Sequence, residues 1–203
     1  MGWRGEEQMF ESCSWLNQPK EWHLEGGALG GVLEVVTDHK TDFWRETHYG
    51  FIRDSGHFYH CETSGDFTAE LRVRARYDEL YDQAGIMVRL DHAHWVKAGI
   101  EMSDGSSLLS SVLTVGQSDW ATGAYNHDPT DFWIRATVAA GVLRLQVSPD
   151  GKTWPLVRLS PFPRAPAYAV GPVCCTPERS GLQVRFSNFR VGAPSGKGLH
   201  DMS

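Results

Sequence analysis

Residues 67–77 alternate apolar and polar side chains almost without exception, and this pattern constrains the fold more than any other part of the chain. Side chains that alternate with a period of two lie on opposite faces of a β-strand. The apolar set is Phe67, Ala69, Leu71, Val73, Ala75 and Tyr77, and the charged set is Glu70, Arg72, Arg74 and Arg76. The stretch is therefore predicted to be an antiparallel strand with one buried face and one charged, solvated face.

Later stretches repeat the alternation. Residues 132–138 and 142–148 each place large aliphatic or aromatic side chains at every second position, and the intervening Ala139-Ala140-Gly141 is typical of a hairpin connection. The Asp150-Gly151 pair predicts a tight turn after the second of these stretches, because glycine adopts positive φ without steric cost. Residues 167–173 and 182–191 are predicted to form the last strands.

Helix signals are weak throughout, since no stretch of a dozen residues keeps apolar side chains at the i, i+3, i+4 and i+7 positions. Many short strands joined by Gly, Pro and Asp turns indicate an all-β sandwich of two antiparallel sheets. The chain of 203 residues shows no internal repeat or linker. A single domain over residues 1–203 is expected, with a core of about residues 12–192 and a tail at 193–203.

Composition and charge exclude several function classes. The formal net charge of −6 argues against a nucleic-acid binder, which needs a basic field. No apolar run is long enough to span a membrane, and the residues after Met1 do not form a secretory leader. Four cysteines without metal-site spacing are typical of reduced thiols. A cytoplasmic protein without cofactor or metal is therefore expected.

Two neighbouring stretches, residues 83–91 and 95–102, place polar side chains on a shared face. In the first, Ala84, Ile86, Val88 and Leu90 belong to the core by parity, and in the second Val96, Ala98, Ile100 and Met102 do so. If the stretches pair as a hairpin, the opposite face gathers five candidate ligand-binding side chains: Gln83, Arg89, Trp95, Lys97 and Glu101. The paired glycines Gly85 and Gly99 are interpreted as leaving room for a ligand on this face.

Two further segments are rich in aromatic and polar residues, which is typical of ordered binding loops. Residues 41–58 contribute the candidates Asp42, Trp44, His48 and Tyr49, and residues 118–120 contribute Trp120. Amides and carboxylates pair with hydroxyl groups, and aromatic rings cover the apolar side of a sugar. The predicted ligand is therefore a carbohydrate or another small polyhydroxylated or anionic molecule.

The residues leave alternatives open. Arg89, Lys97 and Glu101 also fit cross-strand ion pairs on a solvated face. A glycoside hydrolase would use Glu101 as its candidate catalytic residue with a carboxylate from another strand, although Lys97 and Arg89 are expected to keep Glu101 ionised. His57, His60 and Cys61 lie close in sequence, but no convergent metal site is predicted. A scaffold that binds a protein partner, or a homodimer, is the third alternative.

Several strings resemble one known family. They are Tyr81-Asp82-Gln83-Ala84-Gly85, Trp95-Val96-Lys97-Ala98-Gly99-Ile100-Glu101, Thr41-Asp42-Phe43-Trp44 and Ser118-Asp119-Trp120. The chain resembles the domains of unknown function described as regulation-of-enolase-like, in the concanavalin A-like lectin/glucanase superfamily. The resemblance implies a jelly-roll sandwich with ligands across the concave sheet face, and it leaves a regulatory role open. The family name implies architecture more than chemistry.

Overall fold

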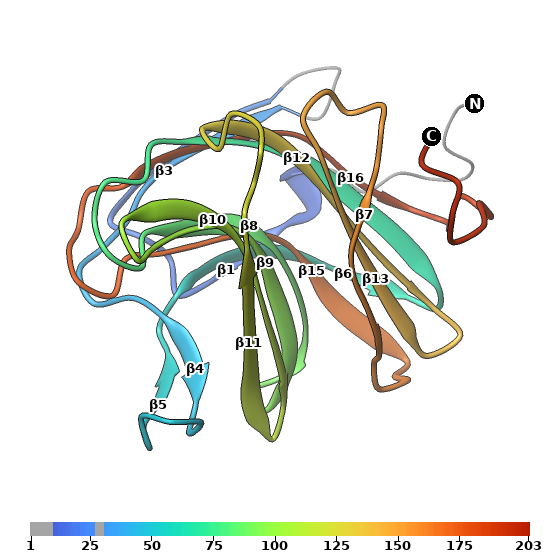
Figure 1. Ribbon diagram of the computed structural model, residues 1–203, viewed down its shortest axis with the longest axis horizontal. Helices are drawn as coiled ribbons and strands as arrows, with labels where there is room; N and C mark the ends of the chain where they lie inside the picture. The colour runs from blue at the N-terminus through green and yellow to red at the C-terminus, as the bar shows by residue number, and fades with distance from the viewer. Residues whose placement is uncertain (1–9, 27–30) are drawn as a thin grey trace.

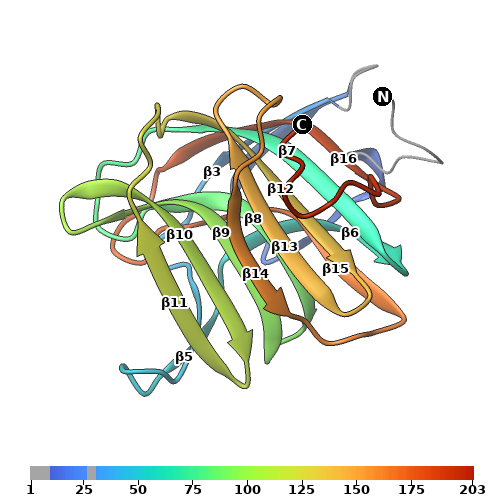
Figure 2. The ribbon, with the colours of Figure 1, turned by 45° about the vertical axis from the view of Figure 1, so that its right-hand side comes forward.

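The computed structural model describes residues 10–26 and 31–203, so the N-terminal residues discussed above lie outside the described part. Two seven-stranded antiparallel sheets pack face to face (Figures 1 and 2). The first sheet has the order β1 (Ser14–Leu16), β6 (His57–Ser64), β15 (Ala167–Cys175), β8 (Gln83–Asp91), β9 (His94–Ser103), β10 (Ser106–Val115), β11 (Gln117–Gly123). The second has the order β14 (Leu156–Pro161), β13 (Val142–Ser148), β12 (Asp131–Ala139), β7 (Phe67–Ala75), β16 (Gln183–Gly192), β3 (Val32–Val36), β2 (Glu21–Glu25).

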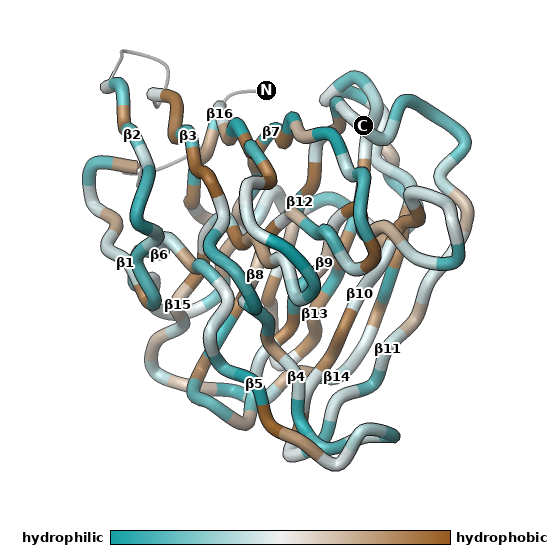
Figure 3. Tube along the Cα trace, turned by 90° about the vertical axis from the view of Figure 1, so that its left-hand side faces the viewer, coloured by the Kyte–Doolittle hydropathy of each residue, from teal (hydrophilic) through white to brown (hydrophobic). Residues whose placement is uncertain are grey.

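The main core lies between the sheets and contains the apolar sets that the alternation predicts. All six apolar residues of the 67–77 stretch are buried in it, together with the apolar sides of β8, β9, β12 and β13. Figure 3 shows hydrophobic and hydrophilic positions alternating along these strands. Burying a large aliphatic or aromatic side chain contributes about 1.5–3 kcal/mol, so this one layer supplies most of the favourable free energy of folding.

One charged position of β7 departs from the expected solvated face. Glu70 is only 1% exposed, because the guanidinium groups of Arg135 and Arg190 both donate to its carboxylate. These two guanidinium groups take the place of the water that the strand pattern predicts around the Glu70 carboxylate. The alternation gives the face correctly, but the neighbouring strands decide how much water reaches it.

The turn at residues 148–154 holds itself together with its own polar groups. The Asp150 carboxylate accepts hydrogen bonds from the backbone N–H groups of Lys152 and Thr153, and the Ser148 hydroxyl accepts one from Gly151. Gly151 has a φ of 70° and lies against the ring of Trp133, where a Cβ would be crowded. The Asp-Gly signal therefore marks a structural turn, as predicted.

The C-terminal segment after β16 is without strands but packs against the second sheet. Arg144 on β13 donates to the backbone oxygens of Lys197 and Gly198, and Trp154 donates its backbone N–H to Met202. The segment predicted as a tail is therefore bonded to the sandwich at several points.

A small hairpin formed by β4 (Phe43–Arg45) and β5 (Ile52–Asp54) projects from the sandwich beside β11 (Figure 1). Residues 41–58 were expected to form an ordered binding loop, and most of that loop is this hairpin. Its residues Phe43 and Trp44 pack against side chains of the first sheet and form with them a second buried cluster, on the face that is turned away from the main core. The cluster consists of Phe43, Trp44, Phe58, Met87, Trp95, Val112, Val173 and Cys175. We call this covered side of the first sheet the hairpin face.

Among the described residues the only helix is the three-residue 3-10 turn η1 (Phe10–Ser12), and none is long and apolar enough to cross a membrane. All four cysteines are present as thiols, and Cys61, Cys174 and Cys175 are buried, as the composition predicts.

Candidate ligand-binding site

A cavity of about 180 Å³ opens on the hairpin face, beside the β4–β5 hairpin. Ligand pockets for drug-sized molecules have volumes of about 300–1,000 Å³, so this one suits a molecule near the size of a single sugar ring. We call it the aromatic pocket. It is lined by Asp42, Trp44, Tyr49, Phe51, Tyr81, Gln83, Lys97, Glu101, Val112, Trp120, Pro177 and Glu178.

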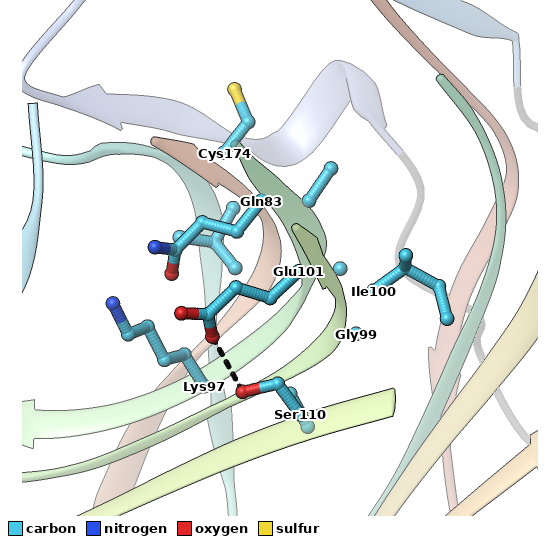
Figure 4. A pocket seen from close by; sticks show the side chains of 11 residues that line it. Gln83, Lys97, Gly99, Ile100, Glu101, Ser110 and Cys174 are labelled. Carbon is cyan, nitrogen blue, oxygen red and sulfur yellow. Dashed lines mark hydrogen bonds between the residues drawn. The ribbon is translucent and has the colours of Figure 1, made fainter. Parts of the chain in front are cut away.

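The floor of the aromatic pocket comes from β8 and β9, which pair as the antiparallel hairpin that places the predicted polar side chains on one face. Gln83 lies opposite Glu101, and Met87 lies opposite Lys97. Figure 4 shows the head groups of Gln83, Lys97 and Glu101 gathered on one side, whereas Ile100 points to the other. A period of two along each strand is sufficient to produce this arrangement.

Lys97 forms a buried ion pair in the floor. Its side chain is 7% exposed, and its Nζ lies 2.8 Å from Oδ1 of Asp42, whose side chain is 18% exposed. Burial alone lowers the pKa of Lys97, but the negative charges of Asp42 and Glu101 outweigh burial, and the pKa lies above its usual value. Lys97 is therefore a permanent cation that links the hairpin to β9.

Glu101 is likewise buried, at 5% exposure, and Ser110 on β10 donates its hydroxyl to Glu101 Oε2 at 2.6 Å. Burial raises the pKa of Glu101 above its ordinary value, although the Lys97 charge and the Ser110 hydrogen bond act in the opposite direction. The Lys97 charge lowers this pKa, in the direction that the sequence-based expectation has it, but burial acts more strongly. Desolvation, which the sequence cannot show, is the largest contribution.

Aromatic rings from three separate segments form the walls. Trp44 comes from β4, Tyr49 from the tip of the hairpin, and Trp120 from β11. Tyr81 precedes β8 and has a φ of 63°, a conformation that a bulky residue adopts only where its surroundings hold it there. Its hydroxyl lies 3.2 Å from that of Tyr49, so the two segments meet across the pocket.

Seven of the ten predicted ligand-binding residues line the aromatic pocket: Asp42, Trp44, Tyr49, Gln83, Lys97, Glu101 and Trp120. Three lie elsewhere. Trp95 is 1% exposed and packs against Phe43 in the second buried cluster, because the hairpin covers this part of the face. A residue sealed in this way is part of the core and has no surface to offer a ligand.

Arg89 and His48 are the other two residues outside the pocket lining. Arg89 donates two hydrogen bonds to the Asp54 carboxylate, at 2.7 and 2.9 Å, and its guanidinium lies over the Phe43 ring. It therefore fastens the hairpin to β8. His48 lies at the tip of the hairpin with its ring against Tyr49, and it does not line the cavity.

The facing glycines Gly85 and Gly99 have a different role from the one expected. They lie directly opposite each other, and a Cβ on Gly85 would be 1.8 Å from the backbone oxygen of Ala98. The space beside them is a cavity of only about 20 Å³, too small for a sugar. The glycines therefore allow a close approach of β8 and β9 rather than space for a ligand.

The sequence-based prediction omitted several residues that line the pocket. Phe51 and Tyr81 lie within or next to segments that were singled out, and their aromatic character was an available signal. Glu178 at the rim follows β15 and has no local pattern that marks it. Its position depends on the loop after β15, in which Arg179 is bonded to Asp82 just before β8.

No metal site accompanies the pocket. Within residues 10–26 and 31–203, no group of three or more His, Cys, Asp or Glu side chains is arranged to hold a metal ion. His57 instead accepts a hydrogen bond from the backbone N–H of Asp38 through Nε2, while its Nδ1 lies 2.7 Å from the Asn17 oxygen. These contacts fix a neutral imidazole in a structural role.

The model of the family described as "Protein of unknown function (DUF1349)" matches residues 15–194. The chain belongs to this family. A Saccharomyces cerevisiae protein named "Regulation of enolase protein 1" is 61% identical over 190 residues, which cover 94% of each chain. The resemblance that the quoted strings predicted is therefore confirmed.

Solved structures confirm the concanavalin A-like jelly roll. A Saccharomyces cerevisiae protein described as functionally unknown aligns with a TM-score of 0.89 and 58% identity, over 93% of this chain and 100% of that one. The GH43 protein BlXynB of Bacillus licheniformis, as its K247S mutant, aligns with a TM-score of 0.68 and 12% identity, over 93% of this chain and 38% of that one. At this identity the second likeness shows the fold alone.

Proposed function

We propose that this protein binds a small carbohydrate or a comparable polyhydroxylated molecule in the aromatic pocket. The observation that carries the proposal is the combination of aromatic walls with a polar floor in one cavity of about 180 Å³. Ring faces cover the C–H side of a sugar, while Gln83, Lys97 and Glu101 exchange hydrogen bonds with its hydroxyls. The relative named for the regulation of enolase supports a regulatory role, in which ligand binding would alter a contact with a partner protein. The reduced thiols support a cytoplasmic location.

Titration of monosaccharides into the full chain, followed by calorimetry, tests the proposal. Trp120→Ala should weaken binding at least about fivefold, because stacking on a ring of this kind contributes about 1–2 kcal/mol. Trp22→Ala is a matched control, since Trp22 on β2 is 37% exposed and Trp120 is 38% exposed. Equal affinities for the wild type and Trp120→Ala, or no binding of any sugar, would contradict the proposal.

A glycoside hydrolase is the second candidate, and one observation favours it. Asp42 and Glu101 line the same cavity, and burial raises the pKa of Glu101 whereas Asp42 is salt-bridged to Lys97. Two carboxyl groups in contrasting environments are the arrangement that separates a general acid from a base or nucleophile. Turnover of aryl glycosides by the wild type that disappears in a folded Glu101→Gln variant would establish this function. Sugar binding without turnover leaves the first proposal standing.

A further inference from the structure

The aromatic rings of the pocket stand at steep angles to one another. The ring planes of Trp44 and Trp120 cross at 88°, with centroids 6.5 Å apart, and those of Tyr81 and Trp120 cross at 73°. Trp44 and Tyr49 meet at 71°. Rings arranged in this way form a box around a small group, whereas a site for a flat sugar face alone needs only one platform.

The polar edges of these rings are already bonded within the protein. Trp44 Nε1 donates to a backbone oxygen at 3.0 Å, and Trp120 Nε1 donates to a serine hydroxyl at 3.1 Å. The Tyr49 and Tyr81 hydroxyls bond to each other. Tyr49 also stacks one face on the Phe51 ring, with centroids 5.3 Å apart. The ring surfaces that remain for a ligand are π faces, which carry partial negative charge and attract cations.

Packing accounts for only part of the box, because Trp44 is buried in the second cluster at 8% exposure whereas two other rings stay open. Tyr49 is 46% exposed and Trp120 is 38% exposed, although both rings contact other aromatic residues. Large aromatic side chains that remain exposed next to one another are typical of a binding surface. The box is thus open to solvent and accessible to a ligand.

The charged groups of the pocket favour a cation. Three carboxyl groups, those of Asp42, Glu101 and Glu178, line it together with one ammonium, that of Lys97. The Lys97 charge is balanced in the floor by Asp42 at 2.8 Å. The remaining charge is negative, and it repels an anionic ligand within a partly desolvated cavity.

The hydrogen-bonding groups of the floor are mainly acceptors. Gln83 donates one of its two amide N–H groups to the backbone oxygen of Tyr81, so its Oε1 and one N–H remain for a ligand. The carboxylates of Asp42 and Glu101 accept as well, and Lys97 is the one donor group among the charged lining residues. A ligand that supplies several donors fits this floor better than one that supplies acceptors.

We propose that the ligand of the aromatic pocket is an amino sugar or a similar amino polyol, with its ammonium group in the aromatic box and its hydroxyls on the acceptor floor. This inference rests on the proposed function, and it specifies the chemical class of the ligand. It also removes small anions from the ligands that the sequence predicts, because the carboxyl groups outnumber Lys97. An ammonium group is attracted to the π faces and to the carboxylates at the same time, whereas a neutral hydroxyl group carries no charge for either attraction.

The experiment compares matched sugars on the full chain by calorimetry at about pH 6.5, where an amine with an ordinary pKa of about 7.7–8.0 is protonated. Each series contains a neutral hexose, its 2-amino derivative and its N-acetylated derivative, in the gluco, galacto and manno forms. In at least one series the amino sugar should bind about tenfold more tightly than both other members. Tetramethylammonium is added as a cation without hydroxyls.

Every outcome decides one of the two proposals. Equal binding of neutral and amino sugars would overturn the inference and leave carbohydrate binding standing. Binding of tetramethylammonium without any sugar would support the aromatic box for cations and overturn carbohydrate binding. If no probe binds, both proposals fall.

A substitution at the exposed rim of the pocket tests the role of charge without disturbing the buried structure. Glu178→Gln changes one exposed carboxylate at the mouth of the pocket, so the preference, measured as the ratio of the affinities for the amino sugar and the neutral hexose, should fall about threefold or more. Glu62→Gln, at an exposed position on β6, is the matched control and should leave the preference unchanged. A preference that is the same in both variants would show that the charge at the rim does not select the ligand and would overturn this part of the inference.

Discussion

Replacing Lys97 with methionine tests whether the floor of the pocket is a buried electrostatic network. Methionine keeps much of the length and apolar stem of lysine but removes the charge, so Asp42 loses the partner that lies 2.8 Å away. With an effective dielectric constant of about 20, the attraction across that distance is about 6 kcal/mol before the cost of desolvating both groups. Removing one member of a buried pair costs about 3–5 kcal/mol in other proteins.

Because the ion pair is partly exposed, we expect the loss of stability in Lys97→Met to lie at the lower end of this range. Asp42 keeps 18% of its side chain exposed, so water compensates for part of the lost charge. Removing the ammonium also removes the charge that lowers the pKa of Glu101, so this pKa should rise further and the remaining carboxyl should be easier to bury without a partner. We therefore expect the free energy of unfolding to fall by about 3 kcal/mol near neutral pH.

Urea denaturation followed by tryptophan fluorescence and by circular dichroism measures the effect. With an m value of about 2–3 kcal/mol per molar urea, the midpoint should fall by about 1–1.5 M. Lys152→Met, at an exposed position in the 148–154 turn, should change the free energy of unfolding by less than about 0.5 kcal/mol. The double variant Asp42→Asn with Lys97→Met should recover part of the loss, since no uncompensated Asp42 charge remains. A loss below about 1 kcal/mol in Lys97→Met would refute the reasoning, because the pair would then behave like an exposed one.

Two further predictions concern the strands and the buried histidine. Gly85→Ala should lower the free energy of unfolding by at least about 3 kcal/mol, because the added Cβ would lie 1.8 Å from a backbone oxygen. In the control Gly123→Ala the added Cβ meets nothing within 4 Å, so this variant should unfold at nearly the wild-type urea concentration. Burial lowers the pKa of His57 below its ordinary value of 6.5, so the folded state binds fewer protons than the unfolded state, and stability should decline as the pH falls below 6.5. Between about pH 7.5 and about pH 5.5 the thermal midpoint of the wild type should fall, and this fall should be smaller in His57→Gln. The control His92→Gln, at an exposed position, should show the full fall. If the fall in His57→Gln equals that of the wild type, other groups cause the pH dependence.

Much of the fold could be predicted because the direction of a side chain along a strand is a local property. The alternation over residues 67–77 predicted every apolar core residue of this stretch, and the parity of Gln83, Lys97 and Glu101 predicted the shared face on β8 and β9. The same argument could not give the exposure of Glu70, which depends on arginines from β12 and β16. Parity assigns a side chain to a face, and the packing of other strands decides what covers that face.

The candidate site shows which features the sequence determines and which depend on the tertiary structure. The sequence by itself determined the polar floor of β8 and β9, because a period of two requires no knowledge of distant segments. Only the tertiary structure decided that the β4–β5 hairpin seals Trp95 and engages Arg89, while Trp120 stays open as a wall. It also decided the protonation tendency of Glu101, since burial in this cavity outweighs the neighbouring cation. Both results depend on contacts between residues far apart in the chain and on the exclusion of water, neither of which the local pattern contains.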